Sequence, residues 1–290
     1  MQKIIVIDYG SQYNHLISRR IRDLGVYSEL WPSSVHPDAI RNDPDIVGII
    51  LSGGPKSISD ENAKTFDKGL FQLDIPVLGI CYGMHLMAVI FGGLVNRAKT
   101  GEFGGCELIV TGKESLLFQG VSSPTKVFMS HKDQIDLCPE IFKITAKTPS
   151  CPVAAMEHRA LPLYAVQFHP EVVHTIDGNK LLANFVFSIC KAQKSWDMTH
   201  FIDSEIERIK DCVKDDKVLL GLSGGVDSSV AAALIAKAVP EQLTCMFIDH
   251  GLLRKNEAEL VIKLLSGNMK LNLIHIDAGK RFLEALRGVT

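Results

Sequence analysis

The stretch Ile75-Pro76-Val77-Leu78-Gly79-Ile80-Cys81-Tyr82-Gly83-Met84-His85 predicts a strand, a sharp turn and a helix in direct succession. Its apolar run ends at Cys81, and the residues that follow repeat with the helical period until Gly92-Gly93 ends the pattern. This order is the geometry of a nucleophile elbow, in which a reactive side chain stands at the end of a buried strand. We expect the flanking glycines to allow the turn and to leave room near the sulfur.

A thiol at a helix N-terminus lies near the positive end of the helix dipole, which favours the nucleophilic thiolate. The alternative interpretation is a buried core cysteine, because free cysteines are among the residues most often buried. The stretch around Cys81 leaves both interpretations open when it is taken alone.

The chain has 290 residues, a formal net charge of −2 and seven cysteines without a C-x-x-C pair. The length suits two domains, and the small charge gives no reason to expect a nucleic acid or a membrane as partner. The cysteine pattern favours neither disulfides nor a metal site, so we expect no bound metal and a reducing, cytoplasmic location. No apolar run approaches the ~18 residues of a membrane span, and Met1–Asp8 predicts a strand rather than a signal peptide.

Short apolar runs alternate with helical patterns from the N-terminus to Gly93. The predicted strands are Ile4–Ile7, Val26–Trp31, Asp45–Leu51 and Pro76–Ile80, and the predicted helices between them are Tyr13–Leu24, Pro37–Asn42 and Glu61–Leu70. This alternation predicts an α/β fold with a doubly wound, mostly parallel sheet and a site at the strand C-termini. A helix over 178–194 is expected to close the domain, after added antiparallel strands at Cys106–Thr111, Lys126–Met129, Phe142–Ala146, Val153–Glu157 and Leu163–Phe168.

Residues 195–200 are expected to link this first domain, residues 1–194, to a second α/β unit over residues 201–290. The predicted helices of the second unit are Phe201–Val213, Ser229–Ala238 and Glu257–Leu265, and the predicted strands are Val218–Leu222, Leu243–Ile248 and Leu271–Ile276. A glycine-rich loop, Ser223–Ser228, joins the first of these strands to the helix that begins at Ser229. Three strands are few for a nucleotide-binding α/β domain, so we expect this incomplete domain to be truncated at Thr290.

Catalysis by a cysteine needs a base beside the thiol and a third group that orients the base. In Val166-Gln167-Phe168-His169-Pro170-Glu171 an apolar strand ends at a histidine, which can face Cys81 if the two strands are neighbours. His169 would then accept the thiol proton, and Glu171 would hold the imidazole tautomer. A surface histidine beside a solvated glutamate is the commoner explanation of this motif when it stands alone.

A third motif, Ser52-Gly53-Gly54-Pro55, also follows a predicted strand. We expect the backbone N–H groups of Gly53 and Gly54 to join the N–H of Tyr82 in an oxyanion hole. An ordinary turn is the alternative for this motif taken alone.

Together, Ser-Gly-Gly-Pro, Gly-Ile-Cys-Tyr-Gly and Gln-Phe-His-Pro-Glu on this α/β pattern resemble the class I (triad-type) glutamine amidotransferases, from Lys3 to Lys191. The resemblance implies that Cys81 attacks the side-chain amide of glutamine, releases ammonia and leaves a glutamyl thioester that water hydrolyses. His169 would then be base and acid in turn, with Glu171 as its orienter. The segment 129–133 resembles the substrate loop of the family, which implies that Asp133 meets the α-amino group of glutamine.

Two positions depart from the pattern of that family. His85 stands where the family usually carries a glutamine that helps to hold the substrate, and Lys132 stands where the loop usually carries glycine. Neither changes the triad, but both put the strength of glutamine binding in doubt. A weakening that affects ground state and transition state equally would raise KM.

In the second domain, Ser223-Gly224-Gly225-Val226-Asp227-Ser228-Ser229 follows an apolar strand. Such a loop offers N–H groups and hydroxyls to a phosphate, and it lacks the Gly-Lys-Ser/Thr of a Walker A loop; an ordinary βα turn is the alternative. The motif resembles the PP-loop of the N-type ATP pyrophosphatases, and Phe247–Arg254 resembles their next segment. The resemblance implies that Ser223–Ser229 bind the pyrophosphate of ATP, with Mg²⁺ among its oxygens.

A triad glutaminase followed directly by a PP-loop domain resembles the family of glutamine-hydrolysing GMP synthases. The resemblance implies the substrates glutamine, ATP and xanthosine 5′-phosphate (XMP), with ammonia displacing AMP from adenylated XMP to give GMP. It also implies a homodimer formed through a C-terminal domain that lies beyond this chain, so we expect this chain alone to be a glutaminase at most. Two alternatives stay open: a stand-alone glutaminase with a PP-loop remnant, and a non-catalytic regulatory module on the same scaffold.

Overall fold

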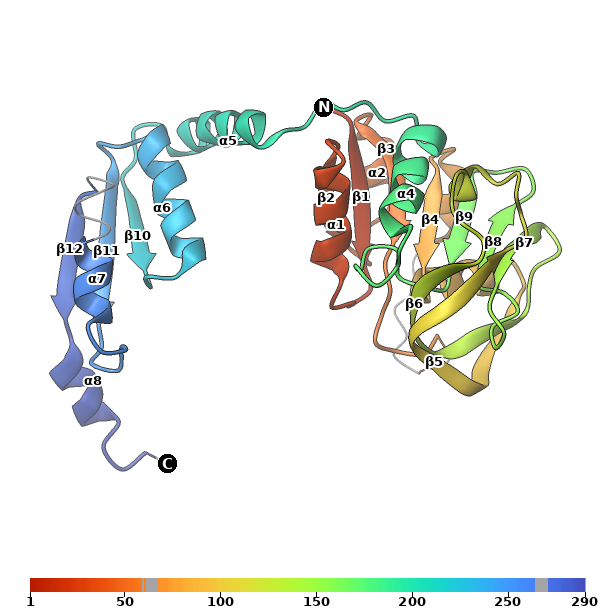
Figure 1. Ribbon diagram of the computed structural model, residues 1–290. Coiled ribbons are helices and arrows are strands. Elements are labelled where there is room, and N and C mark those ends of the chain that lie inside the picture. Colours follow the sequence, from red (N-terminus) through yellow and green to blue (C-terminus); the bar gives the residue numbers. More distant parts are fainter. Residues whose placement is uncertain (59, 61–66, 264–270, 290) are drawn as a thin grey trace. The chain divides into compact units, whose positions relative to one another are not determined.

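The computed structural model describes residues 1–290 except 59, 61–66, 264–270 and 290 (Figure 1). The chain divides into two compact units, Met1–Asp197 and Met198–Thr290. The helix expected at Glu61–Leu70 lies largely outside the described residues, and the described part of that region forms a 3-10 helix, η1, over Lys68–Gln72.

The first unit is built on one nine-stranded sheet with the order β2-β1-β3-β4-β9-β8-β7-β5-β6. The first five strands in this order are parallel to one another, and the remaining pairs are antiparallel. The strands are β1 Lys3–Asp8, β2 Tyr27–Pro32, β3 Ile46–Leu51, β4 Val77–Ile80, β5 Leu94–Val110, β6 Thr125–Leu137, β7 Phe142–Lys147, β8 Ala155–His158 and β9 Leu163–Val166. The predicted fold class, a parallel α/β sheet extended by antiparallel strands, is confirmed, but one strand was assigned wrongly: Leu163–Phe168, expected to be antiparallel, contains β9, which pairs in parallel with β4 because the chain returns to the middle of the sheet.

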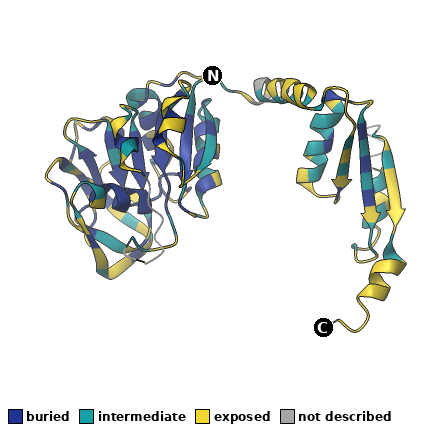
Figure 2. Cartoon of the chain, turned by 180° about the vertical axis from the view of Figure 1, so that it is seen from behind, coloured by how far each residue is buried: buried dark blue, intermediate teal, exposed yellow. Residues whose placement is uncertain are grey.

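Both faces of the parallel strands are covered, as the continuous apolar runs require. Along β1, Ile4 and Val6 belong to one buried cluster and Ile5 and Ile7 to another, because successive side chains point to opposite faces. The first cluster includes side chains of α1 and η3, and the second includes side chains of α3. Figure 2 shows the buried strands of the sheet. Besides η1, the helices described in this unit are α1 Asn14–Asp23, α2 Pro37–Arg41, α3 Tyr82–Ile90, η2 Leu116–Phe118, α4 Gly178–Ala183 and η3 Asn184–Ile189.

Two antiparallel strands are much longer than predicted. The expected strand Cys106–Thr111 is the end of β5, which begins at Leu94, and Lys126–Met129 is part of β6, which runs to Leu137. Residues 96–105 are polar and rich in glycine, so they carry no apolar alternation, and their pairing with β6 makes the strand. As a consequence, Ser130–Asp133, expected as a loop, belongs to β6.

The closing helix is shorter than the predicted span 178–194. After α4 the chain widens into the π-helical turn η3 and leaves the helix at Cys190, and Lys191 has a positive φ of 56°. The side-chain amide of Asn184 donates to the carbonyls of Leu117 (3.0 Å), in η2, and Gln119 (2.8 Å), just after it. This contact with another segment, which periodicity does not reveal, lies at the start of the π turn.

The second unit has a parallel sheet with the strand order β10-β11-β12. Its elements are α5 Met198–Val213, β10 Val218–Leu222, α6 Val226–Ala238, β11 Leu243–Asp249, α7 Glu257–Lys263, β12 Leu273–Asp277 and α8 Gly279–Ala285. Two helices start earlier than predicted: α5 begins inside the expected linker 195–200, and α6 begins inside the glycine-rich motif, at Val226. Within the described residues, none of the helices is long and apolar enough to span a bilayer.

Candidate active site

Cys81 occupies the one-residue turn between β4 and α3. Its backbone angles, φ 52° and ψ −103°, lie in a region that residues other than glycine rarely adopt. The surrounding backbone holds this conformation: the Cys81 N–H donates to the carbonyl of Val166 (2.8 Å), and the Cys81 carbonyl accepts from the N–H of His85 (3.2 Å). The predicted strand, turn and helix are therefore present, and the strain is carried by the cysteine itself.

The two glycines that flank this turn have a different role from the one expected. A Cβ on Gly79 would lie 2.8 Å from the backbone of Gly83, and a Cβ on Gly83 would lie 2.4 Å from the carbonyl oxygen of Leu51. Neither glycine has a positive φ, and neither lines the pocket beside the sulfur. The glycines are needed because α3 packs directly on β3 and β4, not because a substrate needs the space.

His169 follows a strand that is the parallel neighbour of β4, since Ile80 pairs with Val166 of β9. The two residues therefore reach the same edge of the sheet, where sites of parallel α/β sheets lie. His169 Nδ1 lies 2.7 Å from Glu171 Oε1, and both side chains are buried. The carbonyl of His169 accepts a hydrogen bond from Thr175 Oγ1 (2.6 Å), so the turn that carries the imidazole is fixed.

The surroundings of His169 favour the protonated imidazole. Burial by itself lowers its pKa, but the neighbouring Cys81 sulfur and the hydrogen bond and negative charge of Glu171 raise the pKa to about 10. Because Nδ1 is engaged by Glu171, Nε2 is the nitrogen available to the thiol. Cysteine, histidine and glutamate thus form one connected set of side chains.

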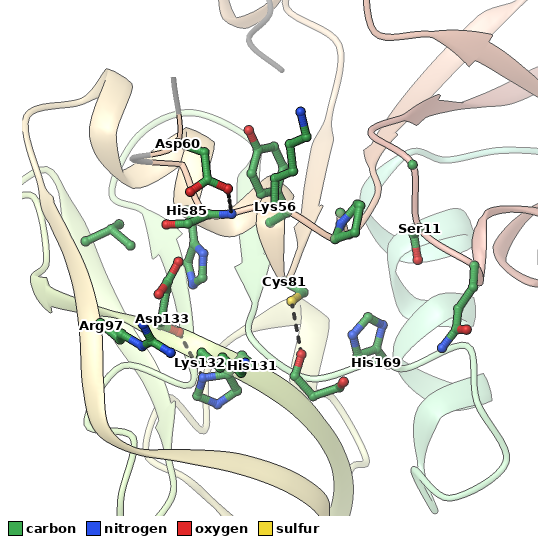
Figure 3. A pocket seen from close by; sticks show the side chains of 18 of the residues that line it. Ser11, Lys56, Asp60, Cys81, His85, Arg97, His131, Lys132, Asp133 and His169 are labelled. Carbon is green, nitrogen blue, oxygen red and sulfur yellow. Dashed lines mark hydrogen bonds between the residues drawn. The ribbon is translucent and has the colours of Figure 1, made fainter. Parts of the chain in front are cut away.

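A pocket of about 720 Å³ opens beside this set, as Figure 3 shows. Among the residues predicted for the site, its lining includes Gly54, Cys81, Tyr82, His85, Asp133 and His169. Gly53 is not part of the lining but adjoins it: a Cβ at this position would meet Cε1 of the His169 ring at 3.2 Å, so the glycine lets the imidazole pack against the chain. Lys132, the second departure, also lines the pocket and is exposed.

Sequence reasoning missed several residues that line the pocket, among them Ser11, Lys56 and Arg97 (Figure 3). For Ser11 a signal existed, because this residue follows β1 at the same edge of the sheet as Cys81. Tyr13, expected at the start of a helix, lies just before α1 and sets its ring edge-on to His169 at a centroid distance of 5.3 Å.

His85 is buried and is linked to the sulfur through Gln167. Its Nε2 lies 2.7 Å from Gln167 Oε1, and Gln167 Nε2 lies 3.7 Å from Cys81 Sγ. Burial is the largest influence on His85 and lowers its pKa to about 4. At neutral pH the ring is therefore uncharged.

We expect His85 to make the first unit less stable at acid pH. Its pKa falls from 6.5 to about 4 on folding, so between these values the unfolded chain binds the proton more strongly. Stability that is present above pH 6.5 is lost as the pH falls towards 4, by roughly 3 kcal/mol for this group. Urea unfolding followed by tryptophan fluorescence measures this, because both tryptophans, Trp31 and Trp196, lie in the first unit.

The matched control for this pH dependence is His85→Gln, which keeps a hydrogen-bond donor and cannot titrate. Other buried groups titrate in both proteins, so the difference between the two curves isolates His85. If the free energy of unfolding changed equally with pH in the native chain and in His85→Gln from pH 7 to pH 4, the lowered pKa of His85 would be contradicted.

The described residues contain one group of side chains with the composition of a metal site: Glu102, His131 and Cys151, whose ligand atoms lie within 4.8 Å of one another. Glu102 already accepts hydrogen bonds from Thr148 (2.7 Å) and Ser150, and its other oxygen lies 3.1 Å from His131 Nε2. A cation would have to displace these bonds. The group instead ties β5 to the part of β6 that carries Asp133.

In the second unit, the glycine-rich motif forms a loop and the first turn of α6. Gly225 N–H donates to Ser223 Oγ (3.2 Å), and Ser229 Oγ donates to the carbonyl of Gly225 (2.8 Å). Gly224 has a φ of 78°, and a Cβ there would lie 2.7 Å from Val261. The loop is exposed and leads directly into the N-terminus of α6, a setting suited to an anion.

Comparison with known proteins identifies the class to which this site belongs. The glutamine amidotransferase class-I family matches residues 5–189, and the NAD synthase family matches residues 197–286. The chain belongs to the class-I glutamine amidotransferase family.

The particular relatives are glutamine-hydrolysing GMP synthases. Those of Geobacillus kaustophilus and Streptococcus thermophilus are 50% and 51% identical over the whole chain. The chain spans about half the length of these curated relatives, 56% and 55%. A solved structure from Thermoplasma acidophilum, described as that of a putative GMP synthase subunit, is 33% identical, with a TM-score of 0.58, over 66% of this chain and 94% of that one.

Proposed function

We propose that the first unit hydrolyses the side-chain amide of glutamine, with Cys81 as nucleophile, His169 as base and acid, and Glu171 as the group that orients His169. One observation carries this assignment: neighbouring parallel strands bring Cys81 and His169 to one sheet edge, and Glu171 lies 2.7 Å from the far nitrogen of the ring. Membership of the class-I amidotransferase family supports it.

In the first half of the reaction, the Cys81 sulfur attacks the amide carbon of glutamine, and the C–N bond breaks when His169 gives its proton to the nitrogen, which leaves as ammonia. A glutamyl thioester remains on Cys81. In the second half, His169 takes a proton from water, the hydroxide attacks the thioester, and glutamate leaves as the sulfur is released. Gly54 and Tyr82 line the pocket beside the sulfur and are our candidates for the oxyanion donors.

The substrate would enter the pocket as an α-amino acid, so both of its charges need partners. Asp133 is half-buried in the lining and is our candidate for the α-ammonium group. Asp133 lies in strand β6, and His131, two residues earlier in the same strand, donates from Nδ1 to the Asp133 carbonyl (2.9 Å). This hydrogen bond and the Glu102–His131 contact hold the carboxylate at the pocket wall.

We propose further that the chain is part of a glutamine-hydrolysing GMP synthase and works in the cytoplasm. Ser223–Ser229 would bind the pyrophosphate of ATP, Mg²⁺ would be held among the phosphate oxygens, and ammonia would aminate adenylated XMP. The exposed loop and the helix N-terminus that follows it fit an anionic group, and identity near 50% to GMP synthases supports the assignment. The homodimer expected for the longer enzyme belongs to the same proposal.

Ammonia release from glutamine, measured with and without ATP, Mg²⁺ and XMP, tests the function. We expect release by this chain and, after acid quenching, a glutamyl adduct on the peptide that contains Cys81. If no ammonia is released under any of these conditions and no adduct forms, the result would favour the non-catalytic regulatory module. Equilibrium dialysis with ATP and Mg²⁺ separates the other alternative, because a chain that releases ammonia but does not bind ATP would be a stand-alone glutaminase.

A further inference from the structure

The side chain of Gln167 is completely buried between two residues of the site. Its Oε1 lies 2.7 Å from His85 Nε2, and its Nε2 lies 3.7 Å from Cys81 Sγ, within hydrogen-bond range for sulfur. Its own backbone N–H donates to the carbonyl of Ala154 (2.8 Å), so the side chain starts from a fixed position in the sheet. The triad mechanism gives this residue no task.

The amide of Gln167 is oriented with Oε1 towards His85 and with Nε2 towards the sulfur. Gln167 Oε1 can only accept, so the nitrogen of His85 that faces it must carry the proton. The ring is neutral at physiological pH because burial lowers its pKa to about 4, so its single proton sits on this nitrogen. In this orientation the amide N–H₂ faces the sulfur, and a His85 ring protonated on the nitrogen facing Oε1 holds it there, whereas the flipped amide would put a carbonyl oxygen beside the sulfur and repel a thiolate.

The sulfur has a second neighbour of the opposite kind. The Cys81 thiol donates to the carbonyl oxygen of Ser130 at 3.9 Å, the contact drawn as a dashed line in Figure 3. An acceptor beside a thiol favours the protonated form, and a donor favours the thiolate. An N–H from Gln167 therefore opposes the influence of Ser130 on the attacking atom.

We propose that Gln167 is a catalytic residue that donates an N–H to the Cys81 sulfur and stabilises the attacking thiolate, and that His85 is the positioning residue that fixes its amide. The role in turnover rests on the proposed glutaminase function, since the same thiolate would attack glutamine. What position 85 must supply is an N–H donor to Gln167. An imidazole and an amide can both supply one, which accounts for histidine at a position where the family usually has glutamine.

The test is the rate at which iodoacetamide alkylates Cys81, measured from about pH 6 to pH 10 by peptide mass spectrometry, which separates Cys81 from the other cysteines. Three variants are compared with the native chain: Gln167→Met, which keeps the length without the donor, His85→Leu and His85→Gln. We expect the midpoint of the profile to rise by about half a pH unit or more in Gln167→Met, with a roughly threefold or greater loss of rate near pH 7. His85→Leu should shift in the same direction, and His85→Gln should keep the native midpoint.

Other titratable and charged groups line the same pocket, namely Tyr13, Lys56, Asp60, Tyr82, Arg97, His131, Lys132, Asp133 and His169. They are present in every variant, so only a difference between profiles is interpreted, and the range starts above the pKa of His85. An unchanged midpoint in a folded Gln167→Met chain would overturn the proposal. If that variant does not fold, as judged by tryptophan fluorescence, equal midpoints in His85→Leu and His85→Gln would overturn it.

The alkylation profile needs no glutamine, so it separates this inference from the proposed function. A native chain that releases no ammonia but shows the expected shifts would contradict the glutaminase assignment and leave the role of Gln167 at the sulfur intact. Ammonia release by the native chain, together with identical alkylation profiles in all variants, would support the glutaminase assignment and contradict the role of Gln167.

Discussion

Replacement of Cys81 by alanine is expected to abolish ammonia release from glutamine, with a loss on the order of 10⁴-fold or more. Alanine keeps the backbone of the turn but removes the only atom that can form the thioester. His169 and Glu171 remain in place, but a base without a nucleophile cannot attack the amide carbon. Initial rates of ammonia formation in purified native and variant chains measure the effect.

The matched control for this prediction is Cys212→Ala. Cys212 is an exposed free thiol in α5 of the second unit, so its loss removes a cysteine without touching the triad. We expect native turnover in this control. Turnover by Cys81→Ala within tenfold of the native rate would show that the nucleophile lies elsewhere.

Gly83→Ala is expected to lower the free energy of unfolding of the first unit by about 3 kcal/mol or more, which is a large effect for the addition of one methyl group. The new Cβ would lie 2.4 Å from the carbonyl oxygen of Leu51 and 2.7 Å from its Cβ. Gly83 is in the first turn of α3 and its N–H donates to the carbonyl of Ser52 (3.1 Å), so the helix cannot move away without losing this bond. Urea unfolding followed by tryptophan fluorescence gives the free energy of unfolding of this unit.

Gly92→Ala, just past the other end of the same helix, is the control for Gly83→Ala. Gly92 has a φ of 86°, but nothing lies within 4 Å of the position of its Cβ. Backbone strain is then the only cost, about 1 kcal/mol. If both variants lost the same free energy, the close approach of α3 to β3 would not be what selects glycine at position 83.

The local signals in the sequence were sufficient for the fold class and for the central set of side chains. Buried parallel strands need continuous apolar runs, so Ile4–Ile7 and Pro76–Ile80 are recognisable as strands from their residues alone. Because parallel strands end at one edge of a sheet, residues that directly follow such runs meet there. That rule suggested that His169 could face Cys81 if their strands were neighbours, and the parallel pairing of β9 with β4, which the sequence did not predict, brings them together across 88 positions of the chain.

Contacts between distant segments were not visible in the sequence. The length of β5 and β6 depends on their pairing with each other, and the break in the closing helix coincides with the hydrogen bonds of Asn184 to residues in and just after η2. The need for Gly83 comes from Leu51 in another strand, not from the turn in which the glycine was noticed. Periodicity describes neighbours along the chain, so it cannot report such contacts.

The sequence by itself determined which strands are buried, which residues end them and therefore which thiol, imidazole and carboxylate share the site. Only the tertiary structure decided what surrounds the sulfur: the carbonyl of Ser130 and the amide of Gln167, whose oxygen contacts His85. The physical reason is that a hydrogen bond depends on distance and direction between atoms from separate strands and helices. Those are set by how the elements pack, not by the order of the residues.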